Sequence, residues 1–164
     1  MPLVSIESDA EALALTTICD FEAPPERVWQ VWADARKLER WWAPPGYPVT
    51  FTRHDFVVPG GSSFVMAGPD GKELGTLYWH YRAIEPPALI VLADGLSAEE
   101  GGGTDGMPGP SGMEVRLSPT ETGTRMTVTS RFASLDELEE QLAMGTEEEM
   151  RQYWGQIDEV LAAG

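Results

Sequence analysis

Cysteine and histidine are nearly absent from this chain. Cys19 is the only cysteine, which excludes an internal disulfide and a zinc site built from several thiolates. The two histidines, His54 and His80, are too few for most histidine-based metal sites. We therefore expect no metal and no cofactor. Cys19 lies in an apolar run with no basic neighbour that would lower the pKa of its thiol, so we interpret it as a strand residue rather than a reactive thiol.

Positive charge is also scarce. The chain has 11 Lys and Arg against 27 Asp and Glu, a formal net charge of -16. Binding to nucleic acid or to an anionic membrane surface requires clustered basic side chains, so neither partner is expected. From Ser134 onward there are nine acidic residues and one basic residue, Arg151. This pattern indicates a solvated acidic helix face, and the alternative is a docking face for a basic partner.

Long hydrophobic runs are missing as well. No apolar run approaches the roughly 20 residues that span a bilayer, and residues 1–7 lack the basic and apolar regions of an export signal. We therefore expect a cytoplasmic location. Apolar residues make up 42% of the 164 residues and charged residues 23%, which is typical of a globular chain. We expect a single domain over 1–164, with its core at about 12–162 and a glycine-rich loop at 97–112.

The first third of the chain predicts one strand and two short helices. Residues 12–22 are apolar and threonine-rich, which favours a strand. Pro24 fits the first turn of a helix, and Asp34 can cap a second helix that ends at residues 44–46, Pro-Pro-Gly. The apolar faces of the two helices contain Val28, Trp29, Val31 and Trp32, then Leu38, Trp41 and Trp42. The pair is locally basic and could pack near the acidic carboxy terminus, through Arg27, Arg36, Lys37 and Arg40.

The middle of the chain predicts successive antiparallel strands. We expect them at 49–52, 63–66, 74–84, 89–92, 113–117 and 124–132. The pair Gly60 and Gly61 indicates a bend or bulge, and residues 69–71, Pro-Asp-Gly, a tight turn. The continuous apolar run at 89–92 is typical of a strand covered on both faces.

The carboxy-terminal residues predict two helices. Ser134 and Glu137 have the spacing of a capping box, and Thr146 with Glu149 repeats it after Gly145. We therefore expect a short helix, a break at Gly145 and a long helix to about residue 161. The apolar stripe of the long helix consists of Met150, Tyr153, Trp154, Ile157, Val160 and Leu161.

This order of elements resembles the helix-grip fold of the SRPBCC superfamily, the START and birch-pollen-allergen-like domains. Within it, the chain is similar to the branch named after the heat-shock protein 90 ATPase activator homologues. The resemblance covers about residues 12–162. It depends on Ala23-Pro24 with Val28-Trp29, Trp41-Trp42 with Pro45-Gly46, Pro59-Gly60-Gly61, Gly68-Pro69-Asp70-Gly71, Pro86-Pro87 with Leu89, and Gly123-Thr124. The eukaryotic activator uses a further domain, so we do not expect this chain alone to stimulate a chaperone.

The resemblance implies an α+β helix-grip fold, in which a curved antiparallel sheet wraps around the last helix and encloses an apolar cavity. Candidate lining residues are Trp42, Phe64, Met66, Trp79, Tyr81, Met113, Phe132, Met144, Tyr153 and Trp154. The alternation around residue 80 leaves open which pair faces the cavity, Trp79 with Tyr81 or His80 with Arg82.

Three functions are compatible with this sequence. The first is binding of a small, largely hydrophobic molecule in the cavity. The second is an enzyme of cyclase, dehydratase or hydrolase type in the same cavity, with His80, Arg82 or Tyr153 transferring protons or supporting an oxyanion. The third is a chaperone-linked interaction module that uses the acidic terminal helix. No catalytic constellation can be identified, and both histidines are expected to be structural or at the surface. A homodimer through an exposed strand edge is a further hypothesis.

Overall fold

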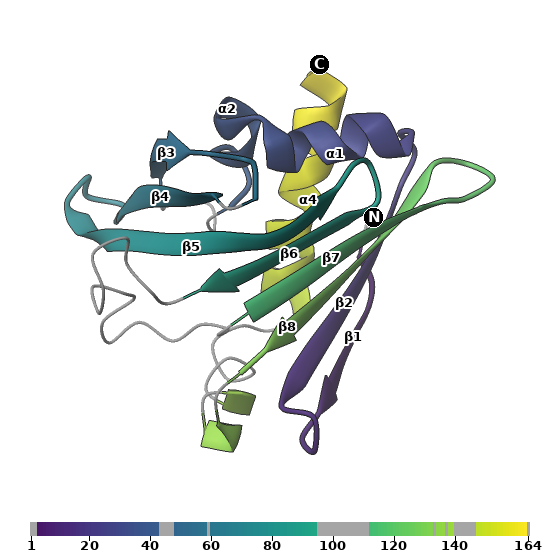
Figure 1. The fold of residues 1–164 in the computed structure, drawn as a ribbon, viewed down its shortest axis with the longest axis horizontal. Coiled ribbons are helices and arrows are strands. Elements are labelled where there is room, and N and C mark those ends of the chain that lie inside the picture. Colours follow the sequence, from purple (N-terminus) through teal and green to yellow (C-terminus); the bar gives the residue numbers. More distant parts are fainter. Residues whose placement is uncertain are drawn as a thin grey trace.

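A single antiparallel sheet of eight strands, in the order β1-β2-β8-β7-β6-β5-β4-β3, forms the frame of the molecule (Figure 1). In this computed structural model the described residues are 3–42, 48–58, 60–94, 112–132, 134–136, 138–139 and 147–163. The strands are β1 (Leu3–Asp9), β2 (Ala14–Phe21), β3 (Val49–His54), β4 (Gly60–Ala67), β5 (Glu73–Glu85), β6 (Leu89–Asp94), β7 (Gly112–Pro119) and β8 (Thr124–Arg131). The expected loop up to residue 111, the helix stop at 44–46 and the break at Gly145 lie outside the described residues.

The sequence predicted seven of these strands and missed β1. This strand pairs with β2 at one edge of the sheet, where Ile6 lies opposite Thr17. Ile6 packs against the core, whereas Val4 is 51% exposed. An edge strand that buries so little apolar surface leaves only a weak alternation in the sequence, which is too weak to predict β1.

The bulge expected at Gly60 and Gly61 lies elsewhere. Both glycines pair regularly with β5, and the register shifts instead in the β3–β4 ladder between Phe51 and Arg53. A Cβ atom at Gly60 would lie 2.4 Å from the carbonyl oxygen of Val57, so the glycine permits a close approach of two backbone segments. The turn predicted at 69–71 is confirmed, with Gly71 at a φ of 82°.

Strand β6 is covered less completely than expected. Ile90 and Leu92 are buried on the inner face, but Leu89 and Val91 are only half-buried on the other. The prediction that both faces of this strand are covered is therefore correct for the inner face only.

Two short helices cover one end of the sheet. Helix α1 (Pro25–Ala33) begins after Pro24 and buries its four predicted apolar residues. Helix α2 (Ala35–Leu38) follows directly, and the carboxylate of Asp34 accepts a hydrogen bond from the amide of Arg36 at 2.9 Å, as the capping prediction required. The chain continues as a helical turn to Trp42, whose amide donates to the carbonyl of Leu38.

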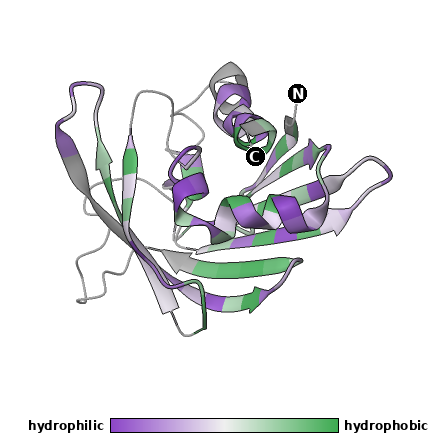
Figure 2. Ribbon diagram, turned by 90° about the horizontal axis from the view of Figure 1, so that it is seen from above, coloured by the Kyte–Doolittle hydropathy of each residue, from purple (hydrophilic) through white to green (hydrophobic). Residues whose placement is uncertain are grey.

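Helix α4 (Glu147–Ala163) crosses the concave side of the sheet, and Figures 1 and 2 show it lying beside α1 within the curve. Trp154, Ile157 and Val160 are buried in the main core, which confirms the predicted stripe at these positions. The guanidinium of Arg27 on α1 donates a hydrogen bond to the carbonyl of Leu161 in the last turn of α4. A cation suits this end of a helix, so the predicted contact between the basic helix pair and the carboxy terminus is confirmed at Arg27.

The described side chains form two apolar clusters. The main cluster joins the inner face of the sheet to α1, α2 and α4. The second is small and contains Leu15, Phe132 and Leu138. Leu138 belongs to the predicted helix at Ser134, and its amide donates to the carbonyl of Ser134. Among the described helices, none has the length and apolarity that crossing a membrane requires.

Cys19 lies on β2 and is 0% exposed. Burial, followed by the nearby charges of Asp20 and Asp158, raises the pKa of its thiol to about 12. We therefore expect no reaction of the folded protein with a disulfide reagent such as dithionitrobenzoate, and about one thiol per chain to react after unfolding in guanidinium. Rapid labelling under native conditions, monitored by absorbance, would contradict this placement.

Candidate functional site

Aromatic side chains fill the junction between the sheet, α2 and α4. The ring of Trp41 lies 4.7 Å from that of Trp32 and 5.5 Å from that of Trp42, both edge to face. Trp154 on α4 contacts Trp41, with ring centroids 6.0 Å apart. On the strand side, Trp42 meets Phe64 at 6.1 Å. These contacts connect all layers of the fold through rings whose mutual geometry is favourable.

Two side chains of α4 hydrogen-bond to the end of the α2 segment. The hydroxyl of Tyr153 donates to the carbonyl of Trp42 at 2.5 Å, and the amide nitrogen of Gln156 donates to the carbonyl of Trp41 at 3.2 Å. Burial raises the pKa of Tyr153, so its phenol stays neutral and serves as a donor. The position of α4 relative to the aromatic junction is therefore set by polar contacts as well as by packing.

The structure brings most of the predicted lining residues together. Those in or against the main cluster are Trp42, Phe64, Met66, Tyr81, Met113, Tyr153 and Trp154. Phe132 does not join them, because it packs in the second cluster with Leu15 and Leu138. The side chain of Trp79 and the whole of Met144 lie outside the described part of the chain.

On β5, it is the face that carries Tyr81 that points into the core. Its side chain is only 4% exposed and contacts the core, whereas Arg82 is exposed. Arg82 is therefore not available for the enzymatic role considered for it inside the fold. A register shift between Tyr81 and Ala83 then brings Ile84 against the core, a change of face that no strict alternation predicts.

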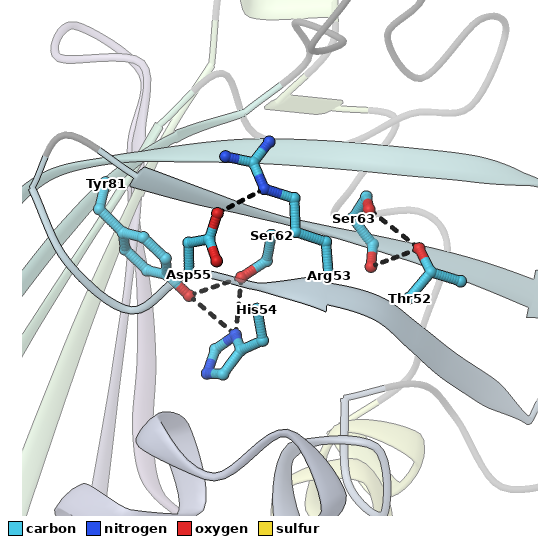
Figure 3. A network of polar contacts seen from close by, with 7 residues as sticks. All are labelled: Thr52, Arg53, His54, Asp55, Ser62, Ser63 and Tyr81. Carbon is cyan, nitrogen blue, oxygen red and sulfur yellow. Dashed lines mark hydrogen bonds and ion pairs between the residues drawn. The ribbon is translucent and has the colours of Figure 1, made fainter.

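A polar network that the sequence did not predict lies on the inner side of β3, β4 and β5 (Figure 3). His54 Nδ1 lies 2.7 Å from Ser62 Oγ and 3.3 Å from the hydroxyl of Tyr81. The Ser62 and Tyr81 hydroxyls are 2.9 Å apart. The other imidazole nitrogen, Nε2, lies 3.1 Å from the carbonyl oxygens of both Trp32 and Ala33 at the end of α1.

These partners define the protonation state of His54. Backbone carbonyls only accept, so Nε2 carries the proton, and Nδ1 accepts from the hydroxyl of Ser62. The Ser62 oxygen in turn accepts from Tyr81. Burial lowers the pKa of His54, although the bonds to Ala33 and Trp32 and nearby carboxylates act in the opposite direction. The network is therefore a chain of neutral groups.

The network joins three strands to α1 rather than presenting a reactive group. A serine hydroxyl that donates to a neutral imidazole is the first requirement for a nucleophile. However, Ser62 is only 2% exposed and its oxygen already bonds to both His54 and Tyr81. No pattern in the sequence predicts this arrangement, because His54 faces inward only through the shift between Phe51 and Arg53.

Acid should weaken the protein through His54. The unfolded chain binds a proton near pH 6.5, and the folded chain binds it only at lower pH, so this contribution is complete above about pH 6.5 and is lost as the pH falls below it. We expect a larger loss of urea stability between about pH 7.5 and 5.5 in the native protein than in His54→Gln. Tyr81→Phe, which keeps the imidazole, should retain the larger loss. Equal losses in the native protein and His54→Gln would contradict this.

A shallow depression lies far from these residues, at the β1–β2 hairpin. It is lined by Glu7, Ser8, Asp9, Ala10, Glu11 and Thr16. This polar, acidic surface does not suit a hydrophobic ligand. Within the described ranges, no group of three or more His, Cys, Asp or Glu side chains is placed to hold a metal ion.

The fold and the aromatic junction define a helix-grip protein, and comparison with known proteins gives its family. The sequence profile described as "Activator of Hsp90 ATPase homolog 1-like protein" matches residues 22–162. The chain belongs to this family, within the SRPBCC superfamily. A comparison with curated proteins found no match.

Several solved structures have the same fold. A protein from Arthrobacter aurescens, studied by solution NMR, is 40% identical, with a TM-score of 0.85 over 98% of this chain and 92% of that chain. Protein Ms6760 from Mycobacterium smegmatis is 32% identical, with a TM-score of 0.82 over 99% of each chain. An AHSA1-like protein from Aeromonas hydrophila is 20% identical, with a TM-score of 0.69 over 92% of each chain, a likeness of fold alone.

Proposed function

We propose that the protein binds a small, largely hydrophobic molecule between the inner face of the sheet and α4. The observation that carries this proposal is a set of inward-facing apolar side chains that are only half-buried. These are Trp42, Met66, Met113 and Tyr153, which pack against the fully buried core but keep part of their surface uncovered. Apolar surface left uncovered on the inside of a fold is stabilised when an apolar ligand covers it.

The position of these residues on the sheet supports the proposal. Met66 follows Phe64 on the same face of β4, and Met113 lies opposite the buried Leu92 of β6. The two methionines therefore face the side of the sheet that α4 crosses. Methionine is flexible and polarizable, which suits a surface that adjusts to a ligand.

The family supports the same function. Members of this superfamily commonly bind hydrophobic ligands with this fold. The inner polar groups of the described site, His54 and Ser62, already bond to protein atoms. Ligand affinity would therefore come chiefly from apolar contacts.

Binding can be tested with the neutral fluorescent probe N-phenyl-1-naphthylamine, whose emission rises in apolar surroundings. We expect saturable binding to the native protein and at least roughly tenfold weaker binding to Met113→Glu, because a carboxylate without a partner is costly to cover with an apolar molecule. The control is Val57→Glu, which introduces the same charge at a side chain that is 58% exposed and should leave the affinity unchanged.

Two results would count against this function. One is the absence of saturable binding of the probe to the folded native protein. The other is equal weakening by Met113→Glu and Val57→Glu, since that would locate the probe on the surface. Circular dichroism of both variants would confirm that they are folded.

A further inference from the structure

The indole N–H of Trp32 is a buried donor without a hydrogen-bond partner among the described residues. Trp32 is 2% exposed, so bulk water does not supply the missing partner. The neighbouring Trp41 differs, since its indole nitrogen donates to the carbonyl of Val31 at 2.9 Å. Leaving a buried donor unpaired is costly, and native proteins seldom do so without a functional reason.

Three backbone carbonyls at the end of α1 already accept hydrogen bonds from side chains. The carbonyls of Trp32 and Ala33 accept from His54, and that of Val31 accepts from Trp41. The ring itself is in edge-to-face contact with Trp41 at 4.7 Å and with Trp42 at 5.9 Å. The carbonyls of Val31, Trp32 and Ala33 therefore already have donors within the protein.

Trp32 also adjoins the proposed ligand site. Trp42 links the two, because its ring contacts both the ring of Trp32 and that of Phe64 on β4. Trp42 is half-buried and belongs to the uncovered apolar set. A molecule that contacts Trp42 therefore lies next to the ring of Trp32, which carries the unpaired N–H.

We infer that the Trp32 indole N–H is the polar anchor of the site, and that the ligand is a neutral hydrophobic molecule with an acceptor oxygen, such as a ketone, aldehyde or ester. This inference rests on the proposed binding function. An indole can only donate, so the ligand must accept. A carboxylate fits less well, because a buried charge needs a partner and the described rings around Trp32 carry none.

The test uses two probes of nearly the same shape. In 2-acetylnaphthalene a carbonyl takes the place of a methylene group in 2-ethylnaphthalene. Both are measured by displacement of N-phenyl-1-naphthylamine from the native protein. We expect the ketone to bind about tenfold more tightly, since only the ketone can accept from Trp32.

Trp32→Phe removes the donor and keeps an aromatic ring. In this variant we expect the two probes to bind with nearly equal affinity, with the affinity for 2-ethylnaphthalene changed by less than about twofold. Trp29→Phe makes the same chemical change three residues earlier on α1 and should keep the tenfold preference. Should Trp32→Phe fail to fold, the indole N–H signal of Trp32 in the nitrogen–proton NMR spectrum of the native protein gives an independent readout. It should move downfield on addition of the ketone and remain unchanged with the hydrocarbon.

The results of these experiments support or overturn the hydrogen bond from Trp32 to the ligand. A ketone preference that Trp32→Phe abolishes, or the downfield shift, supports the anchor. Equal binding of the two probes, or a preference that Trp32→Phe retains, overturns the anchor and leaves the binding function standing. An indole signal that does not respond to bound ketone also overturns the anchor, since the N–H would then be held by a neighbouring ring or by water. Failure of every probe to bind overturns the binding function and the anchor together.

Discussion

Trp41→Ala should destabilise the protein by about 3–5 kcal/mol, the usual cost of removing a large buried aromatic side chain. Trp41 is 0% exposed and its ring contacts Trp32, Trp42 and Trp154. No single neighbour can fill the space, because the contacts come from α1, the α2 segment and α4. Urea unfolding followed by circular dichroism would measure the loss.

Two controls separate the ring of Trp41 from its hydrogen bond. Trp41→Phe keeps much of the packing but leaves the carbonyl of Val31 without its donor, so we expect a smaller loss of roughly 1–2 kcal/mol. Val57→Ala trims a side chain that is 58% exposed and should change stability by less than about 0.5 kcal/mol. A loss below about 1 kcal/mol for Trp41→Ala would mean that the aromatic junction does not hold the helices to the sheet.

Gly123→Ala should cost at least about 2 kcal/mol, although it adds one methyl group at a loop. A Cβ atom there would lie 2.0 Å from the carbonyl oxygen of Phe21 and 2.9 Å from the Cα atom of Glu22. Both are backbone atoms, which cannot rotate away as a side chain can. The next residue also holds this contact, since the hydroxyl of Thr124 donates to the carbonyl of Ala23 at 2.6 Å.

The same substitution at another glycine provides the control. A Cβ atom at Gly155, within α4, meets nothing within 4 Å. Gly155→Ala should therefore stabilise the protein by about 0.5–1 kcal/mol, because alanine favours the helix more strongly than glycine does. Urea midpoints should move in opposite directions for the two variants. A shared direction, or no loss for Gly123→Ala, would show that the loop moves away from β2 without cost.

These results bear on how the site is supported. The aromatic junction holds the helices to the sheet, and the network of His54, Ser62 and Tyr81 connects three strands to α1. Acidification therefore acts on the same end of the molecule that holds Trp32. The proposed ligand site and the pH-sensitive histidine share the end of α1, where the Trp32 carbonyl accepts from His54.

The sequence alone determined the order of the elements and much of their burial. The capping aspartate at Asp34, the four apolar residues of α1 and the turn at Gly71 depend on neighbours within a few positions. Short-range physics of this kind can be recognised in a single sequence. The family resemblance depended on the same local signals, and it is confirmed by the match over residues 22–162.

Only the tertiary structure decided which side chains meet inside the fold. The register shift after Phe51 turns His54 inward, and the one after Tyr81 changes the face of the following residues. A shift of one residue exchanges the two faces of a strand, and no local pattern specifies where it occurs. Phe132 was separated from the other predicted lining residues by its place in a second cluster. The unpaired N–H of Trp32 likewise depends on which carbonyls its neighbours occupy, a property of the packed molecule rather than of the sequence around it.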